Sequence, residues 1–214
     1  MPIITYIIIG FTCLLSYQAF NDQGLFHRLL FNPYQINSRK EWYRFFTHGV
    51  VHANYLHLIF NMYALYLFGM KVELIFRVVF GQPKGIFFYI LLYVGALVLS
   101  SFYSFEKHKH DPAYNAVGAS GAVSAVVFSS ILIDPMGGIG LLFIPFFIPG
   151  FIFGLIYLIY SWQMAKRGND NIGHDAHFWG AVYGVLFTIA IKYEFFGLFI
   201  LQVRQYFDGI LHHS

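Results

Sequence analysis

Two short polar clusters lie at the edges of strongly apolar segments of this chain. One is GASG at residues 118–121 and the other is HDAH at residues 174–177. A serine hydroxyl becomes a nucleophile at neutral pH only when an adjacent base takes its proton. Histidine suits that task because its unperturbed pKa is about 6.5. Ser120 and His177 are therefore candidates for a nucleophile and its general base.

A third group of polar side chains lies within the apolar stretch at residues 50–70 and consists of His52, His57 and Asn61. His57 and Asn61 are four residues apart, so a helix would place them on one face. Together with the backbone N–H groups at the start of a helix near Ser120, they could donate hydrogen bonds to an oxyanion. Hydrogen bonding between helices is the alternative role for both, and His52 could instead support the preceding connection.

The elements that must position these residues are apolar stretches of spanning length. The chain has 214 residues, of which 58% are hydrophobic and only 11% charged, whereas soluble domains carry about 25% charged residues. A bilayer span needs about 20 apolar residues, and backbone groups in lipid must be satisfied within helices. Six stretches meet this description, at residues 3–20, 50–70, 86–105, 117–133, 139–160 and 176–192.

These stretches nearly exhaust the sequence, which therefore predicts an all-α membrane protein with a single domain at residues 1–214. The first stretch is expected to be a retained span, because no cation precedes it as in a signal peptide. The tail at residues 194–214 is expected to lie in the membrane interface or to dock loosely.

Small residues indicate which spans approach each other. The stretch at 117–133 has one face of small side chains, and the stretch at 176–192 contains Gly180 and Gly184. Such faces let membrane helices pack closely. If they meet, the two spans run parallel, since one span separates them, and Ser120 and His177 lie at the same end. The small side chains of the first face are Gly118, Gly121, Ala122 and Ala125.

At this point the sequence resembles the rhomboid intramembrane serine proteases. Four motifs in chain order carry the resemblance: WYRFFT at residues 42–47, His52-x4-His57-x3-Asn61, Gly118-x-Ser120-Gly121, and Ala176-His177-x2-Gly180-x3-Gly184. The resemblance runs over the six predicted spans and implies a six-transmembrane-helix rhomboid-like bundle. It also implies a Ser120–His177 dyad without an acidic third member, and an oxyanion site formed by His57, Asn61 and the amide of Ser120, beside Gly118.

The resemblance carries further implications for partners and location. It implies single-span or polytopic membrane proteins as substrates, no cofactor, and residence in the lipid bilayer of a bacterial inner membrane. The dyad would lie near the non-cytoplasmic face, with the connection at 21–49 as an interfacial support and the span at 139–160 as a lateral gate.

One position departs from the family pattern. Many rhomboids carry an aromatic residue one turn after the nucleophile, where it stacks under the catalytic histidine, and this chain has Ser124 there. Trp179 and Tyr183 neighbour His177 in sequence but need not face it. The sequence therefore does not identify the side chain that packs against the His177 imidazole.

Other functions are weighed against this one. A metal site at His174, Asp175 and His177 is not expected, because zinc proteases use an HExxH string that this chain lacks. A non-catalytic rhomboid-like binder of membrane clients is disfavoured by the intact Ser120 and His177. A proton-coupled transporter is disfavoured because no acidic residue is expected deep in the spans. The net charge of +3 comes from scattered cations, so no nucleic-acid partner is expected.

The charge distribution and the rhomboid resemblance predict opposite orientations of the chain in the membrane. With a cytoplasmic amino terminus, the cytoplasmic loops hold five Lys and Arg residues and the opposite loops hold eight. The positive-inside tendency would therefore place the amino terminus outside. The rhomboid resemblance places it inside, and we follow the resemblance.

Overall fold

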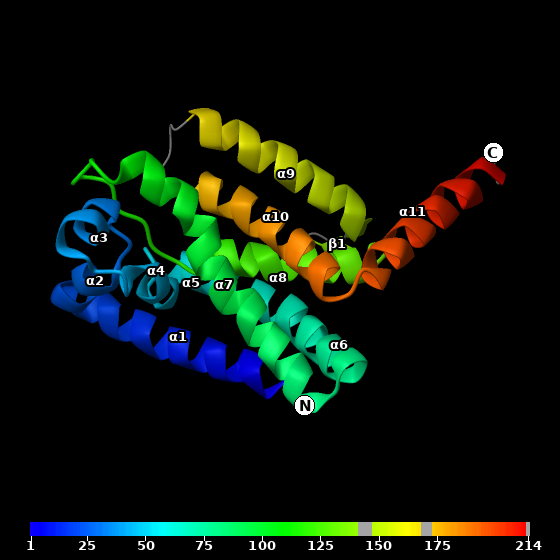
Figure 1. Ribbon diagram of the computed structural model, residues 1–214, viewed down its shortest axis with the longest axis horizontal. Helices are drawn as coiled ribbons and strands as arrows, with labels where there is room; N and C mark the ends of the chain where they lie inside the picture. The colour runs from blue at the N-terminus through cyan, green and yellow to red at the C-terminus, as the bar shows by residue number, and fades with distance from the viewer. Residues whose placement is uncertain (141–146, 168–172, 213–214) are drawn as a thin grey trace.

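The computed structural model describes residues 1–140, 147–167 and 173–212, and these are almost entirely helical. Figure 1 shows the helices gathered in one bundle, with α11 extending beyond it. In chain order the elements are α1 (Ile3–Asn21), α2 (Gln23–Leu29), α3 (Pro33–Arg39), α4 (Arg44–Thr47), η1 (His48–Val50), α5 (Tyr55–Ala64), η2 (Leu65–Gly69), α6 (Met70–Phe80), α7 (Gln82–His108), α8 (Ser120–Ile133), β1 (Gly138–Gly140), β2 (Phe147–Pro149), α9 (Gly150–Arg167), α10 (His174–Ile191) and α11 (Glu194–His212). The all-α bundle predicted from the sequence is confirmed.

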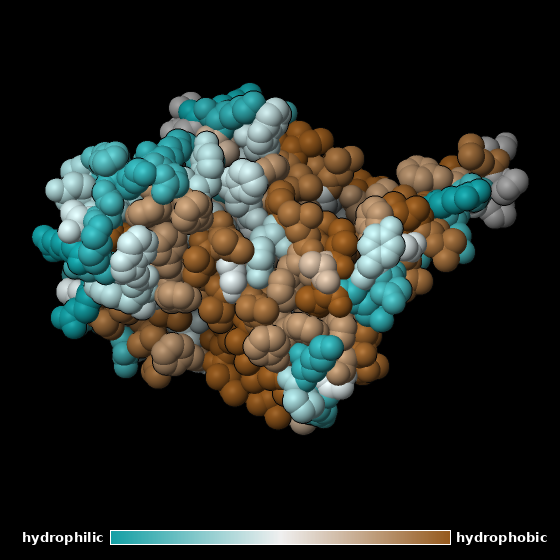
Figure 2. Space-filling view, in the orientation of Figure 1, coloured by the Kyte–Doolittle hydropathy of each residue, from teal (hydrophilic) through white to brown (hydrophobic). Residues whose placement is uncertain are grey.

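The apolar surface of this bundle is suited to lipid. Within the described residues, three helical stretches are long and apolar enough to cross a membrane: α1, the continuous stretch Tyr55–Phe80, and α7. The bent pair α10 and α11 could supply a fourth. Figure 2 shows hydrophobic residues across the middle of one face and hydrophilic residues gathered at the end formed by α2 and α3. The protein is an integral membrane protein.

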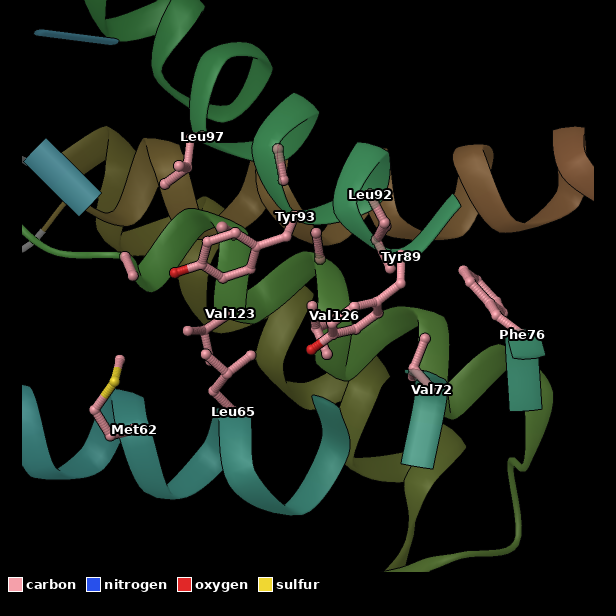
Figure 3. Close-up of a cluster of buried hydrophobic side chains, with 14 of the residues drawn as sticks. Met62, Leu65, Val72, Phe76, Tyr89, Leu92, Tyr93, Leu97, Val123 and Val126 are labelled. Carbon is pink, nitrogen blue, oxygen red and sulfur yellow. The ribbon is translucent and has the colours of Figure 1, made fainter. Parts of the chain in front are cut away.

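The main core forms where three helical stretches meet, as Figure 3 shows. Side chains converge there from α5 to α6, from α7 and from α8, and they are Met62, Leu65, Val72, Phe76, Tyr89, Leu92, Tyr93, Leu97, Val123 and Val126. This core holds α8, the helix that begins at Ser120, in the centre of the bundle (Figure 1).

The second predicted span differs from the observed helix at both ends. The prediction was 50–70, but the helix begins at Tyr55, because the side chain of Asn54 accepts a hydrogen bond from the His57 amide at 2.8 Å. It then continues through η2 and α6 to Phe80. The apolar pattern stops at residue 70 because charged residues follow, yet these residues are helical and one of them is fully buried.

That buried residue is Glu73, which lies at the level of the first turn of α1 and therefore near one end of the bundle. Its carboxylate accepts hydrogen bonds from the amides of Ile4 and Thr5 at 3.1 and 2.8 Å and from the Thr5 hydroxyl at 2.8 Å. The first amides of a helix have no partner within it and carry a partial positive charge. Glu73 therefore caps α1 from α6, which is a structural role rather than a proton path.

The fifth predicted span also begins too early. The prediction was 139–160, whereas the helix α9 starts at Gly150 and is preceded by an antiparallel pair in which Gly138 faces Pro149. Proline has no N–H, and the residue before it is driven away from the helical region. Pro149 therefore marks the point where α9 can begin. Residues 141–146 of the predicted span lie outside the described residues.

The tail is a helix that turns sharply away from α10. α11 bends by 113° relative to α10, and Figure 1 shows it extending from the bundle. Its first turn is docked, because Phe195 is buried against Phe76 with ring centroids 6.5 Å apart. Its outer end leaves Ile210 and Leu211 exposed. Residues 213–214 of the predicted tail lie outside the described residues.

Candidate active site

Ser120 is the first residue of α8 and follows a turn that requires glycine. Gly118 has φ +105°, a region that non-glycine residues rarely adopt. The amide of Val123 bonds to the carbonyl of Ala119 at 2.9 Å, so the N–H of Ser120 has no partner within the helix. The Ser120 side chain is half-buried. The turn thus presents a hydroxyl beside a backbone amide that can bind negative charge.

α8 and α10 pack along their small-residue faces, as predicted. A Cβ atom at Gly180 would collide with the carbonyl of Gly121, and one at Gly184 would collide with the carbonyl of Ala125. Further along, the Thr188 hydroxyl donates to the Ser129 hydroxyl at 2.8 Å, across a sequence separation of 59 residues.

All three contacts share this separation, so the two helices run parallel in one fixed register. The same register sets Ser120, the first residue of α8, level with Trp179, which is two residues after His177 in the first turns of α10. Ser120 and His177 therefore lie at the same end of two closely packed helices. Both side chains are half-buried, which leaves them accessible to another molecule.

The ring of His57 lies directly against the turn that precedes Ser120. A Cβ atom built on Gly118 would come within 2.6 Å of Cε1 and 2.9 Å of Nε2 of His57. Glycine is thus required at this position by close approach as well as by its positive φ. The structure brings His57 and Gly118 together. Asn61 is buried, and its side-chain amide donates to the carbonyl of His57 at 2.9 Å, along its own helix.

His52 lies behind His57. The two ring centroids are 5.1 Å apart with the planes at 75°. The Ser16 hydroxyl donates to the carbonyl of Val50 at 2.9 Å and lies 2.9 Å from Nδ1 of His52. A hydroxyl has one hydrogen, so His52 Nδ1 donates to Ser16. The contacts of His52 link α1 to the ring that faces Gly118.

His48 is a positioning residue that the sequence analysis did not single out. Its carbonyl accepts from the Gly118 amide at 2.9 Å, and its Nδ1 lies 3.2 Å from the Gly118 carbonyl. Its Nε2 lies 3.2 Å from the hydroxyl of Ser101. Burial lowers the pKa of His48, which favours the neutral ring. The backbone carbonyl of His48 holds the Gly118 amide, and its ring lies against the Gly118 carbonyl. Its place four residues before His52 is a sequence signal that could have revealed it.

The connection at residues 21–49 is organised around one buried cation. Arg44 donates to the carbonyls of His27 and Leu30 at 3.0 and 2.7 Å and to the side chain of Gln35 at 2.6 Å. It also pairs with Glu41 at 2.6 Å, and this hydrogen bond lowers the pKa of the Glu41 carboxyl. The connection is thus a folded support. The segment at 41–47 was expected in the interface, and its Trp42 and Phe46 side chains are exposed.

The connection at residues 21–49 is hydrogen-bonded to the non-helical segment that leads to Ser120. Phe31 and Ala116 exchange two backbone hydrogen bonds at 2.9 and 3.0 Å. The side chain of Asn32 donates to that of Asn115 at 3.0 Å. Residues 115–118 are therefore fixed from one side before the turn into α8.

His177 is flanked by an aromatic ring from α9. The rings of Tyr157 and His177 have centroids 6.3 Å apart and planes at 29°. The Tyr157 hydroxyl lies 2.6 Å from that of Ser124. Trp179 instead contacts Tyr103, and the hydroxyl of Tyr183 donates to the Leu91 carbonyl at 3.2 Å, so both neighbours face α7.

The residues around His174 do not form a metal-binding group. Asp175 pairs with Lys107 at 3.2 Å, and the ring of His174 meets that of His177 edge-on at 5.8 Å. Across the described ranges, no cluster of three or more His, Cys, Asp or Glu side chains is suited to a metal ion. The side chains and amide that gather at this end of the bundle are those of Ser120, His177 and His57, with the backbone N–H of Ser120.

Comparison with known proteins finds relatives that are named as rhomboid proteins. Rhomboid protease GlpG of Haemophilus influenzae is 26% identical over 184 residues, which are 84% of this chain and 86% of that protein. RHOMBOID-like protein 12, mitochondrial, of Arabidopsis thaliana is 25% identical over 189 residues, 83% of this chain and 54% of that protein. Rhomboid protease AarA of Providencia stuartii is 27% identical over 109 residues, 47% of this chain and 37% of that protein.

The chain thus spans about half or less of the length of several relatives that it matches. The family model that matches is the rhomboid domain, and it covers residues 39–194, from the last residue of α3 to the first residue of α11. That range includes the helices α5, α7, α8 and α10 that carry the site. This chain belongs to the rhomboid family, which includes serine intramembrane proteases.

Proposed function

We propose that this protein is an intramembrane serine endopeptidase that cuts transmembrane segments of other membrane proteins. Ser120 is the nucleophile and His177 is the general base. The observation that carries the proposal is the parallel register of α8 and α10, in which Gly180 packs on Gly121 and Thr188 bonds to Ser129. This register supports a serine and a histidine at one level, half-exposed to an incoming chain.

The reaction follows from these two groups. His177 takes the proton of the Ser120 hydroxyl while the oxygen attacks the scissile carbonyl carbon, which gives a tetrahedral intermediate. The C–N bond then breaks, and the protonated His177 donates its proton to the leaving amine. Water, deprotonated by His177, attacks the acyl-enzyme ester and releases the second product with Ser120 restored.

The negative charge of the tetrahedral intermediate needs donors placed in advance. The amide of Ser120 is one, because it has no partner within α8. His57 is a second, since its ring lies against Gly118 two residues earlier. Asn61 is a third: it is buried one turn along α5 from His57, and its side chain must reorient to reach the oxyanion.

Members of the rhomboid family act on membrane proteins within the bilayer. For this chain the proposed substrates are single-span or polytopic membrane proteins, and the proposed location is a bacterial inner membrane with the dyad near the non-cytoplasmic face. One relative is named as mitochondrial, and that name concerns only the relative.

The direct test is cleavage of a generic single-span reporter by the purified protein in liposomes. Wild type should cut it, whereas Ser120→Ala and His177→Ala should be inactive. Ser130→Ala is the matched control, because Ser130 is a serine of the same helix, α8, but lies more than two turns from the proposed dyad. It should cleave like wild type. A fluorophosphonate probe should label wild type and not Ser120→Ala.

The outcomes separate the candidate functions. Turnover that persists in Ser120→Ala would end the serine protease proposal. A wild type that binds the reporter without cutting it, and does not react with the probe, would identify a non-catalytic binder of membrane clients. Thermal unfolding of each variant in detergent should match wild type, since Ser120→Ala removes one hydroxyl and little volume.

A further inference from the structure

We propose that Tyr157 of α9 is the residue that positions the imidazole of His177, and that Ser124 of α8 holds Tyr157 in place. The proposal rests on the proposed Ser120–His177 dyad and adds a positioning residue to it. It is built on two independent contacts, a ring contact on one side of Tyr157 and a hydroxyl contact at its tip.

The ring contact restrains the orientation of His177. Its plane and that of Tyr157 differ by only 29°, at a centroid separation of 6.3 Å, which is an offset and nearly parallel arrangement. Rotation of the imidazole about its last torsion would bring its edge into the tyrosine face. His174 approaches the same imidazole edge-on, at 79°, so it limits a different movement. Tyr157 therefore acts as a flat platform for the proposed base.

Tyr157 can act as a platform because it is itself held on several sides. Its hydroxyl lies 2.6 Å from that of Ser124. Its ring packs against Phe128 of α8 at 5.5 Å and against Phe153 of its own helix at 5.8 Å. A side chain fixed at both its ring and its hydroxyl loses little further freedom when it restrains a neighbour.

The position of Ser124 ties this support to the nucleophile. Ser124 follows Ser120 by four residues, one helical turn along the same face of α8. One helix thus carries the nucleophile and fixes the platform, while α10 carries the base. Displacement of reacting groups by about 1 Å costs on the order of 100-fold in rate. A shift of α9 would therefore move Tyr157 and change the orientation of the His177 imidazole.

Steady-state kinetics on the reporter tests the platform. Tyr157→Leu should lower kcat by about 10- to 100-fold with little change in KM, because the base is misoriented and the client is still bound. Tyr157→Phe keeps the ring and should stay within about fivefold of wild type, as should Ser124→Ala, which removes one hydrogen bond.

Two control variants separate positioning from packing. Tyr160→Leu removes a tyrosine of the same helix that meets His174, not His177, at 5.6 Å, and it should leave kcat unchanged. Leu158→Ala disturbs the same apolar cluster from the same helix and should also leave kcat near wild type. If Leu158→Ala or Tyr157→Phe lowers kcat as much as Tyr157→Leu does, the platform role is wrong.

A readout that does not need turnover keeps this proposal distinct from the proposed function. NMR spectra of protein with 13C-labelled histidine show one Cε1–H signal for each histidine, and the signal that is lost in His177→Ala belongs to His177. The ring current of Tyr157 should shift this signal. The signal should move in Tyr157→Leu and hold its place in Tyr157→Phe and Tyr160→Leu. An unmoved signal in Tyr157→Leu would overturn the contact. Turnover that survives Ser120→Ala would instead defeat the dyad.

Discussion

At the scale of single residues, the candidate site depends on a glycine that has no substitute. Gly118 has φ +105°, and its Cα faces the ring of His57 closely enough that a Cβ atom would lie 2.6 Å from Cε1. The amide and carbonyl of Gly118 are both engaged by His48. The turn before Ser120 is therefore held rigidly, with the His57 ring on one side of it.

This arrangement predicts that His57 and Asn61 act on the rate rather than on binding. His57→Ala and Asn61→Ala should each lower kcat, by about 100- to 1000-fold for a full oxyanion donor, with a smaller change in client binding. Reporter kinetics and a binding assay on the same variants measure the two quantities. His110→Ala is the control, because His110 is exposed beyond the end of α7. Equal losses in binding and turnover would mark His57 and Asn61 as packing residues.

At the scale of elements, the contact between α8 and α10 sets the relative position of the proposed nucleophile and base. Membrane helices gain little from the hydrophobic effect when they associate, so close packing of small residues must hold them together. Gly180 and Gly184 lie against the backbone of Gly121 and Ala125, and backbone atoms cannot move aside as a flexible side chain can. The register of the proposed nucleophile and base follows from this contact.

Gly180→Ala should therefore destabilise the bundle by about 1–3 kcal/mol and abolish turnover, because the added methyl group pushes α10 away from Gly121. Gly10→Ala is the matched control, since a Cβ atom at Gly10 meets nothing within 4 Å. Thermal unfolding in detergent and reporter cleavage check both variants. If Gly180→Ala melts like Gly10→Ala and stays active, the helices are not held by this contact.

At the scale of the whole molecule, the open question is which way the bundle faces. α7 joins the two ends, from Gln82 at one to His108 at the other. The second end also holds Ser120, His177 and the folded connection around Arg44. The Lys and Arg count would place that end in the cytoplasm. Cations are paired at both ends, Lys71 with Asp134 at 2.5 Å at one and Lys107 with Asp175 at 3.2 Å at the other, so ion pairs do not reverse the count, and the orientation expected here rests on the rhomboid resemblance.

We expect the dyad end to face away from the cytoplasm. In a Cys13→Ser background, a cysteine at His110 should react with an impermeant thiol reagent added to intact cells, and a cysteine at Gln82 should react only after the membrane is opened. Both positions are exposed, so they differ only in the side of the membrane that they occupy. The reverse labelling would place the proposed active site in the cytoplasm.

Some of this molecule could be predicted from residue types and spacing alone. The approach of α8 and α10 follows from Gly121, Ala125, Gly180 and Gly184, because glycine and alanine at four-residue intervals have one physical use in lipid, which is close packing. The proximity of His57 to Gly118 followed from the family pattern. The apolar stretches located every spanning helix approximately, since burial in lipid requires length and low polarity.

Other features were decided only by tertiary contacts. Glu73 looks like a loop residue in sequence, and its burial becomes favourable through contacts with Ile4 and Thr5, which are far from it in the chain, and through the ion pair with Arg77. The late start of α9 depends on a strand pair that the apolar pattern does not reveal. Tyr157 is one aromatic residue among many in an apolar run. Its place beside His177 depends on how α9 packs against α8 and α10, because ring contacts and hydroxyl partners between helices leave no periodic trace in the chain.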